Sequence, residues 1–451
     1  MDKITLSRIS IEDDRILYEI TQDKGLGLLQ QDKVALFIRF HCGEEVHIDL
    51  SKIPQSILAV PISLYLLPLT YFYKIELVLP VMDKELYERL PKIYAAYSKM
   101  YGPFSEDWRG KLTVKSVVDT PVASEAGYDK VVFFSGGVDA CSAGINNPGH
   151  NTVLVSIPDI EALAKNEGPL REEKFSLIKN FSKIIGSDWI LISNNFNAAL
   201  YLDSEINNHL RDQKGLNSAA FKFDGWWGIK YLANMCCVAP LAYACGIKNL
   251  VMGSTYEPIE NERGNGNDGA HPSLSNAMAF SDIRFAEQDE IHTLRSDKVS
   301  KIIAWCKSHK KYVRLWVCFQ DRSSQCGLCN KCVRTQLNIL CASENPKDWG
   351  FDTFDEVKFS RLIKSYGYLD TPCWHWDIDK AIDTNRDYPY CNDMLHWLKR
   401  VGYKEYLRKA KSRRVWRSRI SRCIRIFFIH RYPHYLKRIC ERLVTHLKAA
   451  Q

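Results

Sequence analysis

The amino-acid sequence predicts an α/β fold: a doubly wound parallel sheet, flanked by a small N-terminal α+β domain and by a helical, basic C-terminal region. Two observations lead to this fold class. Short apolar runs alternate with helical patterns through the middle of the chain, which is the order that builds parallel sheets covered on both faces. The charge is also uneven, because residues 401–451 hold fifteen Lys and Arg and two Glu in a chain of net charge +8.

Residues 1–125 are predicted to form the N-terminal α+β domain. An amphipathic pattern at 84–100 predicts a helix. The long apolar stretch from Ile57 to Tyr73 contains two prolines and is marginal for the roughly 20 residues that a membrane-spanning helix needs, so it is interpreted as buried core. Four apolar runs bounded by turn residues predict strands: 16–20, 34–40, 46–50 and 73–79.

Residues 126–345 are predicted to form the doubly wound domain. Its apolar runs are interpreted as buried strands because they are short and are separated by helical patterns. Ligands of such sheets bind at the carboxyl ends of the strands, near the point where the strand order reverses. The expected strands are 130–134, 152–157, 189–193, 249–252 and 312–317, and the expected helices are 171–185, 226–245 and 297–309.

Residues 346–451 are predicted to be helical, and the basic character is concentrated near their end. The segment 408–448 mixes Arg and Lys with apolar residues at about helical spacing, as in basic amphipathic helices that lie on anionic membranes. RNA binding and docking on the net acidic remainder of the chain are the alternatives. The expected helices before this segment are 354–366, 377–382 and 394–410.

The N-terminus gives an expectation for the cell compartment. The first fifteen residues mix both charge signs and lack the apolar run of a secretory signal. We therefore expect a cytoplasmic protein, with attachment to the inner membrane face as the alternative that the basic segment offers. The fifteen cysteines are accordingly expected to be reduced. A homodimer is compatible with the sequence.

A glycine-containing turn directly follows the first predicted strand of the doubly wound domain. It consists of Ser135, Gly136, Gly137, Val138 and Asp139, and a helical pattern begins there. Two glycines let the backbone fold tightly against an anion, while the N–H groups of the turn and of the helix N-terminus point at it. Ser135 adds a hydroxyl donor, and Asp139 offers a carboxylate to Mg²⁺ or to a water. The turn therefore predicts a phosphate site, although a strand-to-helix turn can also carry two glycines without a ligand.

Four cysteines near the end of this domain have the spacing of metal ligands. They are Cys318, Cys326, Cys329 and Cys332. Each Cys-x-x-Cys step allows two sulfurs to turn toward one centre, and four thiolates complete the tetrahedron that Zn²⁺ prefers. Because such a site leaves no open position, it predicts a structural zinc. An iron–sulfur cluster and unliganded reduced cysteines are the alternatives.

The turn and the cysteines together resemble a known enzyme family. The string from Ser135 to Asp139 is similar to the signature Ser-Gly-Gly-x-Asp-Ser of the PP-loop ATP pyrophosphatases, which have the HUP (adenine nucleotide alpha hydrolase-like) fold. Ala140 stands where the signature ends in serine, so one phosphate contact is missing or is relocated, with Ser142 following shortly after. With the cysteine spacing, roughly residues 128–340 resemble the QueC-like branch, the 7-cyano-7-deazaguanine synthases.

The resemblance implies further site residues. Gly253 stands where the family has a Gly-rich substrate loop, and Ser156 lies near the end of the second predicted strand; both are assigned to the nucleotide site. The branch's Tyr-Gly-Gln and His-x-x-Glu pattern is missing after that strand, which argues against deazaguanine as the substrate. Lys298, in the first turn of a helix that Ser296 would cap, matches a family lysine that approaches phosphate. It is assigned a catalytic role with Ser135 and Asp139, and a surface lysine is the alternative.

The activity that the resemblance implies is ATP-dependent adenylation of a carboxylate or carbonyl acceptor with release of pyrophosphate, followed by attack of a nitrogen nucleophile. Its cofactors would be ATP, Mg²⁺ and Zn²⁺, and its acceptor a small molecule or a nucleobase. Modification of tRNA, conjugation of a nucleobase to a protein, and a non-catalytic nucleotide-binding module are the alternatives. The polar loop 261–272 is interpreted as a substrate lid with Arg263 and His271. Arg334 is expected either beside the site or on a helix surface.

Overall fold

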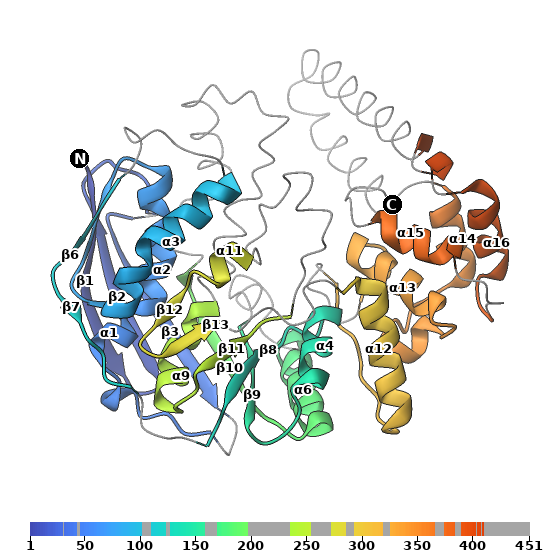
Figure 1. Ribbon diagram of the computed structural model, residues 1–451, viewed down its shortest axis with the longest axis horizontal. Coiled ribbons are helices and arrows are strands. Elements are labelled where there is room, and N and C mark those ends of the chain that lie inside the picture. Colours follow the sequence, from blue (N-terminus) through green and yellow to red (C-terminus); the bar gives the residue numbers. More distant parts are fainter. Residues whose placement is uncertain are drawn as a thin grey trace, which may run out of the picture. The chain divides into compact units, whose positions relative to one another are not determined.

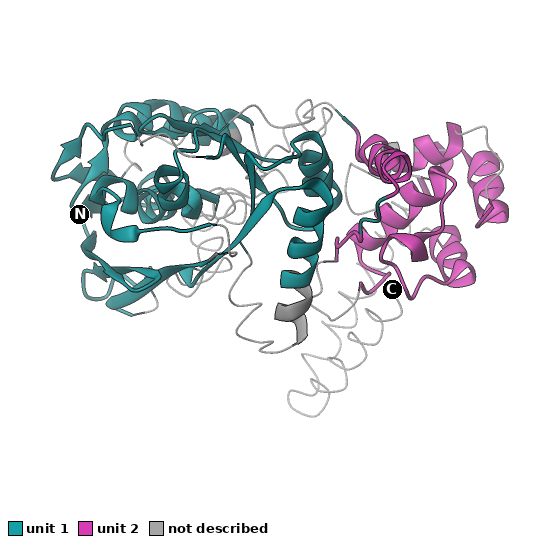
Figure 2. Cartoon of the chain, turned by 90° about the horizontal axis from the view of Figure 1, so that it is seen from below, with its two compact units in different colours: residues 1–293, 311–313 teal, residues 294–310, 314–451 magenta. Residues whose placement is uncertain are grey.

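The computed structural model describes the chain in segments that form two compact units. Unit 1 comprises residues 1–293 with 311–313, and unit 2 comprises residues 294–310 with 314–451; Figure 2 shows them in different colours. The described residues are 1–29, 31–42, 46–101, 110–122, 127–157, 169–196, 235–253, 272–285, 293–318, 325–365, 374–383, 389–402, 404–406 and 408–409.

Unit 1 is an α/β unit around one large, mostly parallel sheet (Figure 1). The order of its eleven strands is β12-β13-β11-β8-β9-β10-β3-β2-β1-β4-β6, and β5 pairs separately with β7. The strands are β1 (Lys3–Glu12), β2 (Arg15–Gln22), β3 (Lys33–Cys42), β4 (Glu76–Leu79), β5 (Met82–Asp83), β6 (Lys111–Val114), β7 (Val117–Val118), β8 (Lys130–Phe133), β9 (Thr152–Ser156), β10 (Asp188–Asn194), β11 (Asn249–Val251), β12 (Ala279–Phe280) and β13 (Ile283–Phe285).

The parallel part of the sheet has a doubly wound order. Strands β13, β11, β8, β9 and β10 are neighbours in that order, and every pair among them is parallel. Counted along the chain from β8, this is the order 3-2-1-4-5, which reverses between β8 and β11. Crevices at such a reversal, beyond the carboxyl ends of the strands, are where open α/β sheets bind ligands.

Helices cover both faces of this sheet (Figure 1). Val131 and Phe133 point into the main apolar core, which also holds the buried residues of α2 and α9. Phe134 points the other way and stacks on Phe181 of α6, with ring centroids 4.4 Å apart. The helices in the described part of unit 1 are η1 (Leu50–Lys52), α1 (Gln55–Leu58), α2 (Val60–Phe72), α3 (Lys84–Tyr101), α4 (Val138–Asn146), α6 (Pro169–Ile185), η4 (Cys236–Val238), α9 (Ala239–Ala244) and α11 (Pro272–Ser275).

The N-terminal strands extend the same sheet. Strand β3 pairs antiparallel with β10, from Ile190 opposite Cys42 to Asn194 opposite Ile38. A buried hydrogen bond from the Tyr65 hydroxyl to the carbonyl of Phe196, 2.6 Å long, ties α2 to the end of β10. An edge strand exposes unpaired N–H and C=O groups, and β3 satisfies those of β10. The expected boundary near residue 125 therefore does not coincide with a division between the two units.

Unit 2 is helical in its described part. Helices α12 and α13 pack together, and α15 packs against both of them. Two ion pairs bridge these helices: Arg334 to Asp377, at 2.5 Å, and Lys380 to Asp297, at 2.9 Å. The helices are α12 (Arg295–Ser308), α13 (Asn330–Cys341), η5 (Pro346–Trp349), α14 (Glu356–Lys364), α15 (Trp374–Asp383) and α16 (Asn392–Val401). The boundary expected near residue 345 falls inside this unit, between α13 and η5.

Two expectations about strands need correction. The segment 312–317 is not a strand, because the Val317 N–H bonds to the Gln325 side chain and the Leu315 N–H to the Trp349 carbonyl, at 3.3 Å. The fifth parallel strand is instead the short β13. Residues 46–49 are also not a strand, and the Asp49 side chain caps η1.

Within the described residues, none of the helices has the length and apolar character needed to cross a membrane.

Candidate functional site

The turn from Ser135 to Asp139 lies at the carboxyl end of β8, where the strand order reverses. β8 ends at Phe133, and α4 begins at Val138, so the turn joins a buried strand directly to a helix N-terminus. Gly136 has a φ of +80°, a conformation that glycine adopts readily and other residues rarely do. Ser135 is exposed, Asp139 is half-buried, and Val138 is fully buried. The Ser135 hydroxyl is therefore exposed at the turn, while Val138 anchors the start of α4 in the apolar interior.

Two neighbouring strands contribute the predicted residues Ser156 and Gly253 to this place. Ser156, at the end of β9, donates its hydroxyl to the carbonyl of Phe134, immediately before the turn. Gly253 follows β11 and lies against the first turn of α4: a Cβ added there would be 2.4 Å from the Asp139 carbonyl oxygen. Three chain segments therefore meet at the turn, and Gly253 is needed because the helix backbone leaves no room for a side chain.

The electrostatics of this region favour an anion. The first N–H groups of α4 have no partner inside the helix, and the helix dipole adds a partial positive charge at the same end. The N-cap of α4 is Gly137, which has no side chain to occupy these donors. Asp139 in the first turn is favourable for the helix without a ligand, and its carboxylate oxygen is also a ligand type that Mg²⁺ prefers.

Lys298 belongs to unit 2 and is buried there. It lies in the first turn of α12 and is 2% exposed, which excludes the alternative of a solvated surface lysine. Ser296 does not cap this helix: the N-cap is Leu294, and the Ser296 hydroxyl is buried without a hydrogen-bond partner among the described residues. The expected cap is two residues too late, because α12 begins at Arg295 and its N-cap is Leu294.

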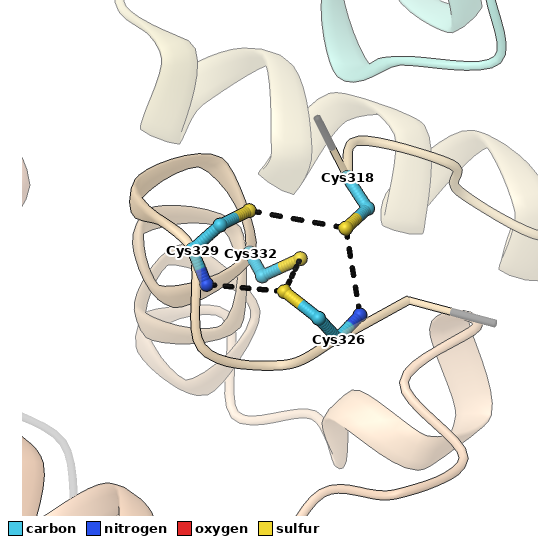
Figure 3. A group of neighbouring side chains, drawn as sticks. All are labelled: Cys318, Cys326, Cys329 and Cys332. Carbon is cyan, nitrogen blue, oxygen red and sulfur yellow. Dashed lines mark hydrogen bonds between the residues drawn. The ribbon is translucent and has the colours of Figure 1, made fainter. Parts of the chain in front are cut away.

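The four predicted cysteines come together in unit 2 (Figure 3). Their sulfur atoms all lie within 4.8 Å of one another, and the cysteines are not paired as disulfides. Cys329 is the N-cap of α13, and Cys332 lies in its first turn. The Sγ atoms of Cys326 and Cys332 are 3.9 Å apart, and those of Cys318 and Cys329 are 4.0 Å apart. The group can hold a metal ion such as zinc.

The sulfur separations discriminate between candidate metals. A tetrahedron with Zn–S bonds of about 2.3 Å places its sulfurs roughly 3.8 Å apart, close to the separations found here. A four-iron cluster holds its cysteine sulfurs further apart, because the inorganic core stands between them. The arrangement therefore fits one tetrahedral ion better than an iron–sulfur cluster.

Hydrogen bonds within the group stabilise negative charge on one sulfur. The N–H groups of Leu328 and Cys329 donate to Cys326 Sγ at 3.4 and 3.2 Å. Hydrogen bonds with the other thiols, above all with Cys318, lower the pKa of Cys326. The pKa of Cys318 is raised, chiefly by its contact with Cys326, and the pKa of Cys332 is raised, chiefly by its contact with Cys318. Several thiolates cannot share this space without a cation, and a bound cation would favour the thiolate form of each.

Arg334 is neither a surface arginine nor an evident ligand contact. Its guanidinium pairs with Asp377 inside unit 2, where the two side chains are 11% and 2% exposed. Breaking a buried pair leaves an unpaired charge, so this pair holds α13 to α15.

The predicted lid contacts Arg263 and His271 lie outside the described residues, as do residues 226–234 and nearly all of the basic segment 408–448.

Gln325 and Gln336 are site features that the sequence did not indicate. Both are buried beside the cysteines, and each uses its side-chain amide to hold backbone near them. Only the position of Gln325, directly before Cys326, could have drawn attention to it.

Comparison of the chain with models of protein families, with curated proteins and with solved structures finds no match.

Proposed function

We propose that this chain is an ATP-dependent adenylating enzyme, a PP-loop ATP pyrophosphatase of the QueC-like kind. The observation that carries the proposal is the placement of the Ser135–Asp139 turn: it lies at the reversal of a 3-2-1-4-5 parallel sheet and opens directly into α4. The turn lacks the Gly-Lys-Ser/Thr ending of P-loop kinases, so it has no lysine of its own for a γ-phosphate. A turn without this lysine is more consistent with cleavage of ATP between the α and β phosphates than with transfer of the γ-phosphate.

The residues of the turn would act by binding and positioning. The N–H groups of Gly136 to Val138 would bind the β and γ phosphates, the Ser135 hydroxyl would donate to the same oxygens, and Asp139 would orient Mg²⁺. An acceptor carboxylate oxygen then attacks the α-phosphorus, and pyrophosphate leaves with the bonding electrons. Ammonia or another amine next attacks the carbonyl carbon, AMP leaves, and the nitrogen loses a proton to give the amide. Such steps depend on orientation and charge neutralisation more than on a nucleophilic side chain.

The remaining predicted residues take supporting roles in this proposal. Ser156 and Gly253 would border the nucleotide, because each lies at the end of a strand next to β8. Lys298, in unit 2, is assigned a role at the phosphates by the family resemblance alone. The four cysteines would hold a structural Zn²⁺, because a closed set of protein ligands leaves no position for substrate.

Product analysis with ATP labelled at the α-phosphate tests this proposal. With Mg²⁺ and an acceptor from a panel of carboxylates and nucleobases, each offered with ammonia, labelled AMP and pyrophosphate are expected. Labelled ADP would place the chain in another class of enzyme. Binding of the unreactive analogue α,β-methylene-ATP is measured separately by calorimetry, because it needs no acceptor.

A non-catalytic nucleotide-binding module is the second candidate, and Ala140 favours it. Ala140 is 7% exposed in the first turn of α4 and supplies no hydroxyl where the family signature has one. Tight binding of α,β-methylene-ATP without AMP formation across the panel would support this candidate. If the chain is an enzyme, Ala140→Ser is expected to raise turnover; a module that has lost its activity would gain none from this one hydroxyl. A tRNA or protein acceptor would be recognised by AMP formation only when that macromolecule is supplied.

A further inference from the structure

The cysteine centre of unit 2 is built from two separate arms of the chain. Cys318 ends one arm, and Cys326 begins the other, which continues through Cys329 to Cys332 on α13. A metal ion needs all four sulfurs at once, so the two arms must be held at a fixed separation. Direct contact between the arms includes the hydrogen bond from the Cys326 N–H to Cys318 Sγ, at 3.5 Å. Because a thiol sulfur is a weak acceptor, this hydrogen bond alone does not set the geometry.

Gln325 fastens the two arms together. It directly precedes Cys326 and is 2% exposed. Its Oε1 accepts from the Val317 N–H at 2.8 Å, one residue before Cys318. Its Nε2 donates to the carbonyl of Leu315 at 3.0 Å and to the carbonyl of Gly350 at 2.8 Å. Three short, buried hydrogen bonds therefore fix Gln325 against the first arm and against the end of η5.

Gln336 holds the second arm from the other side. It lies on α13, is 2% exposed, and donates from Nε2 to the carbonyl of Gly327 at 3.3 Å. Gly327 lies in the turn between Cys326 and Cys329. In this turn the N–H groups of Leu328 and Cys329 donate to Cys326 Sγ. Because this is one hydrogen bond of moderate length, Gln336 constrains the turn less strongly than Gln325 constrains the arms.

We propose that Gln325 is a positioning residue of the metal centre, and that Gln336 assists it. Neither amide reaches the metal; each holds the backbone that carries the ligands. Residues that orient metal ligands from outside typically change metal affinity about 10-fold to 100-fold when they are replaced. The inference rests on the proposed metal centre and is independent of the proposed reaction.

The test compares Zn²⁺ affinity with fold stability in matched variants of the full chain. Gln325→Met keeps the length and removes the three hydrogen bonds, and Gln336→Met removes one. Tyr406→Phe is the control, because Tyr406 is buried in unit 2 and its hydroxyl donates to the carbonyl of Ile363 on α14, which belongs to neither arm. The Zn²⁺ dissociation constant is measured at fixed pH by competition with a chromophoric chelator, and unfolding is followed with and without Zn²⁺.

Gln325→Met is expected to raise the Zn²⁺ dissociation constant by about 10-fold to 100-fold, and Gln336→Met by a smaller factor. Tyr406→Phe is expected to lower stability while leaving the dissociation constant within about 3-fold of the parent, since its hydrogen bond involves neither arm. Equal dissociation constants for Gln325→Met and Tyr406→Phe would overturn the assignment. If Gln325→Met yields no folded protein, Gln336→Met decides, and an unchanged dissociation constant there counts against the proposal.

The outcome is separable from that of the ATP assay. A parent protein that binds no Zn²⁺ overturns the metal centre, and with it the role of Gln325, whatever the ATP assay gives. A parent that binds Zn²⁺ with the expected pattern among the variants supports the assignment even if no acceptor yields AMP.

Discussion

Gly253 touches the backbone of Asp139: a Cβ at position 253 would lie 2.4 Å from the Asp139 carbonyl oxygen and 2.6 Å from its carbonyl carbon. Side-chain atoms could rotate away from such a contact, but these are backbone atoms of the first turn of α4. The end of β11 and the start of α4 therefore fix one another. This contact couples the position of the candidate phosphate-binding turn to the neighbouring strand across the sheet reversal.

Gly253→Ala is expected to displace α4 and to weaken nucleotide binding. The methyl group must push backbone apart, which typically costs about 1–3 kcal/mol of stability. Gly127→Ala is the control, because a Cβ there meets nothing within 4 Å. Calorimetric titration with α,β-methylene-ATP and thermal unfolding measure the two effects. Equal nucleotide affinity in both variants would show that the contact does not shape the site.

Tyr65→Phe is expected to weaken the junction between the N-terminal region and the parallel sheet. The lost hydroxyl leaves the buried carbonyl of Phe196 without this donor, at a cost of about 1–3 kcal/mol. Tyr87→Phe is the control, since Tyr87 is 45% exposed on α3 and should change stability by less than about 0.5 kcal/mol. Urea unfolding measures both. An unchanged unfolding free energy for Tyr65→Phe would mean that this hydrogen bond contributes nothing to the junction.

The parallel sheet could largely be predicted from the sequence, because buried parallel strands are short apolar runs between helical patterns. The runs that contain β8, β9, β10 and β11 are of this kind. β13 has only three residues, too few to stand out, whereas the apolar segment 312–317 resembles a strand but has its backbone bonded elsewhere. The local sequence pattern does not reveal whether an extended segment forms its backbone hydrogen bonds with a neighbouring strand or with other groups.

In the candidate site too, features encoded in short stretches of sequence could be predicted, whereas contacts between distant residues could not. The Ser135–Asp139 turn and the cysteine ligands lie in short strings whose spacing carries the chemistry. The pairing of β3 with β10 and the hydrogen bonds of Gln325 join residues that are far apart or unremarkable in the sequence. Burial of Lys298 likewise depends on tertiary packing around α12, because a lysine near a helix N-terminus is as compatible with solvent as with a core.

Cys329→Ser is expected to abolish stoichiometric metal binding and to destabilise unit 2. Serine is a poor zinc ligand, and a closed site contributes folding free energy when its metal is bound. The parent should carry about one zinc per chain by elemental analysis. Cys391→Ser is the control, because Cys391 is buried in unit 2 near Glu356 and away from the four-cysteine group. Iron with visible absorbance in the parent would contradict the assignment of zinc.

Deletion of residues 411–451 is expected to lower binding to anionic lipid vesicles. This segment, outside the described residues, holds twelve Lys and Arg and one Glu, and each basic residue near an anionic surface contributes about 1 kcal/mol. Vesicle sedimentation with phosphatidylserine should show binding by the full chain that falls as salt rises. Neutral vesicles are the control. If the full chain ignores anionic vesicles at low salt, RNA or the acidic remainder of the chain becomes the expected partner.

Asp139→Asn is expected to abolish AMP formation while the fold remains intact. The substitution keeps the size of the side chain and leaves the backbone contact with Gly253 in place. It removes the negative charge that would orient Mg²⁺, and loss of metal-stabilised charge in the transition state costs several kcal/mol, or on the order of 100-fold or more in rate. Asp129→Asn is the matched control, because Asp129 lies at the opposite end of β8, is exposed, and accepts a hydrogen bond from Asn151 that an amide oxygen can also accept. Mg²⁺-dependent binding of α,β-methylene-ATP and production of labelled AMP are compared in both variants. Parent-level AMP production by Asp139→Asn would remove Asp139 from the proposed mechanism, whereas equal losses in the two variants would point to a general effect of charge on this part of the sheet.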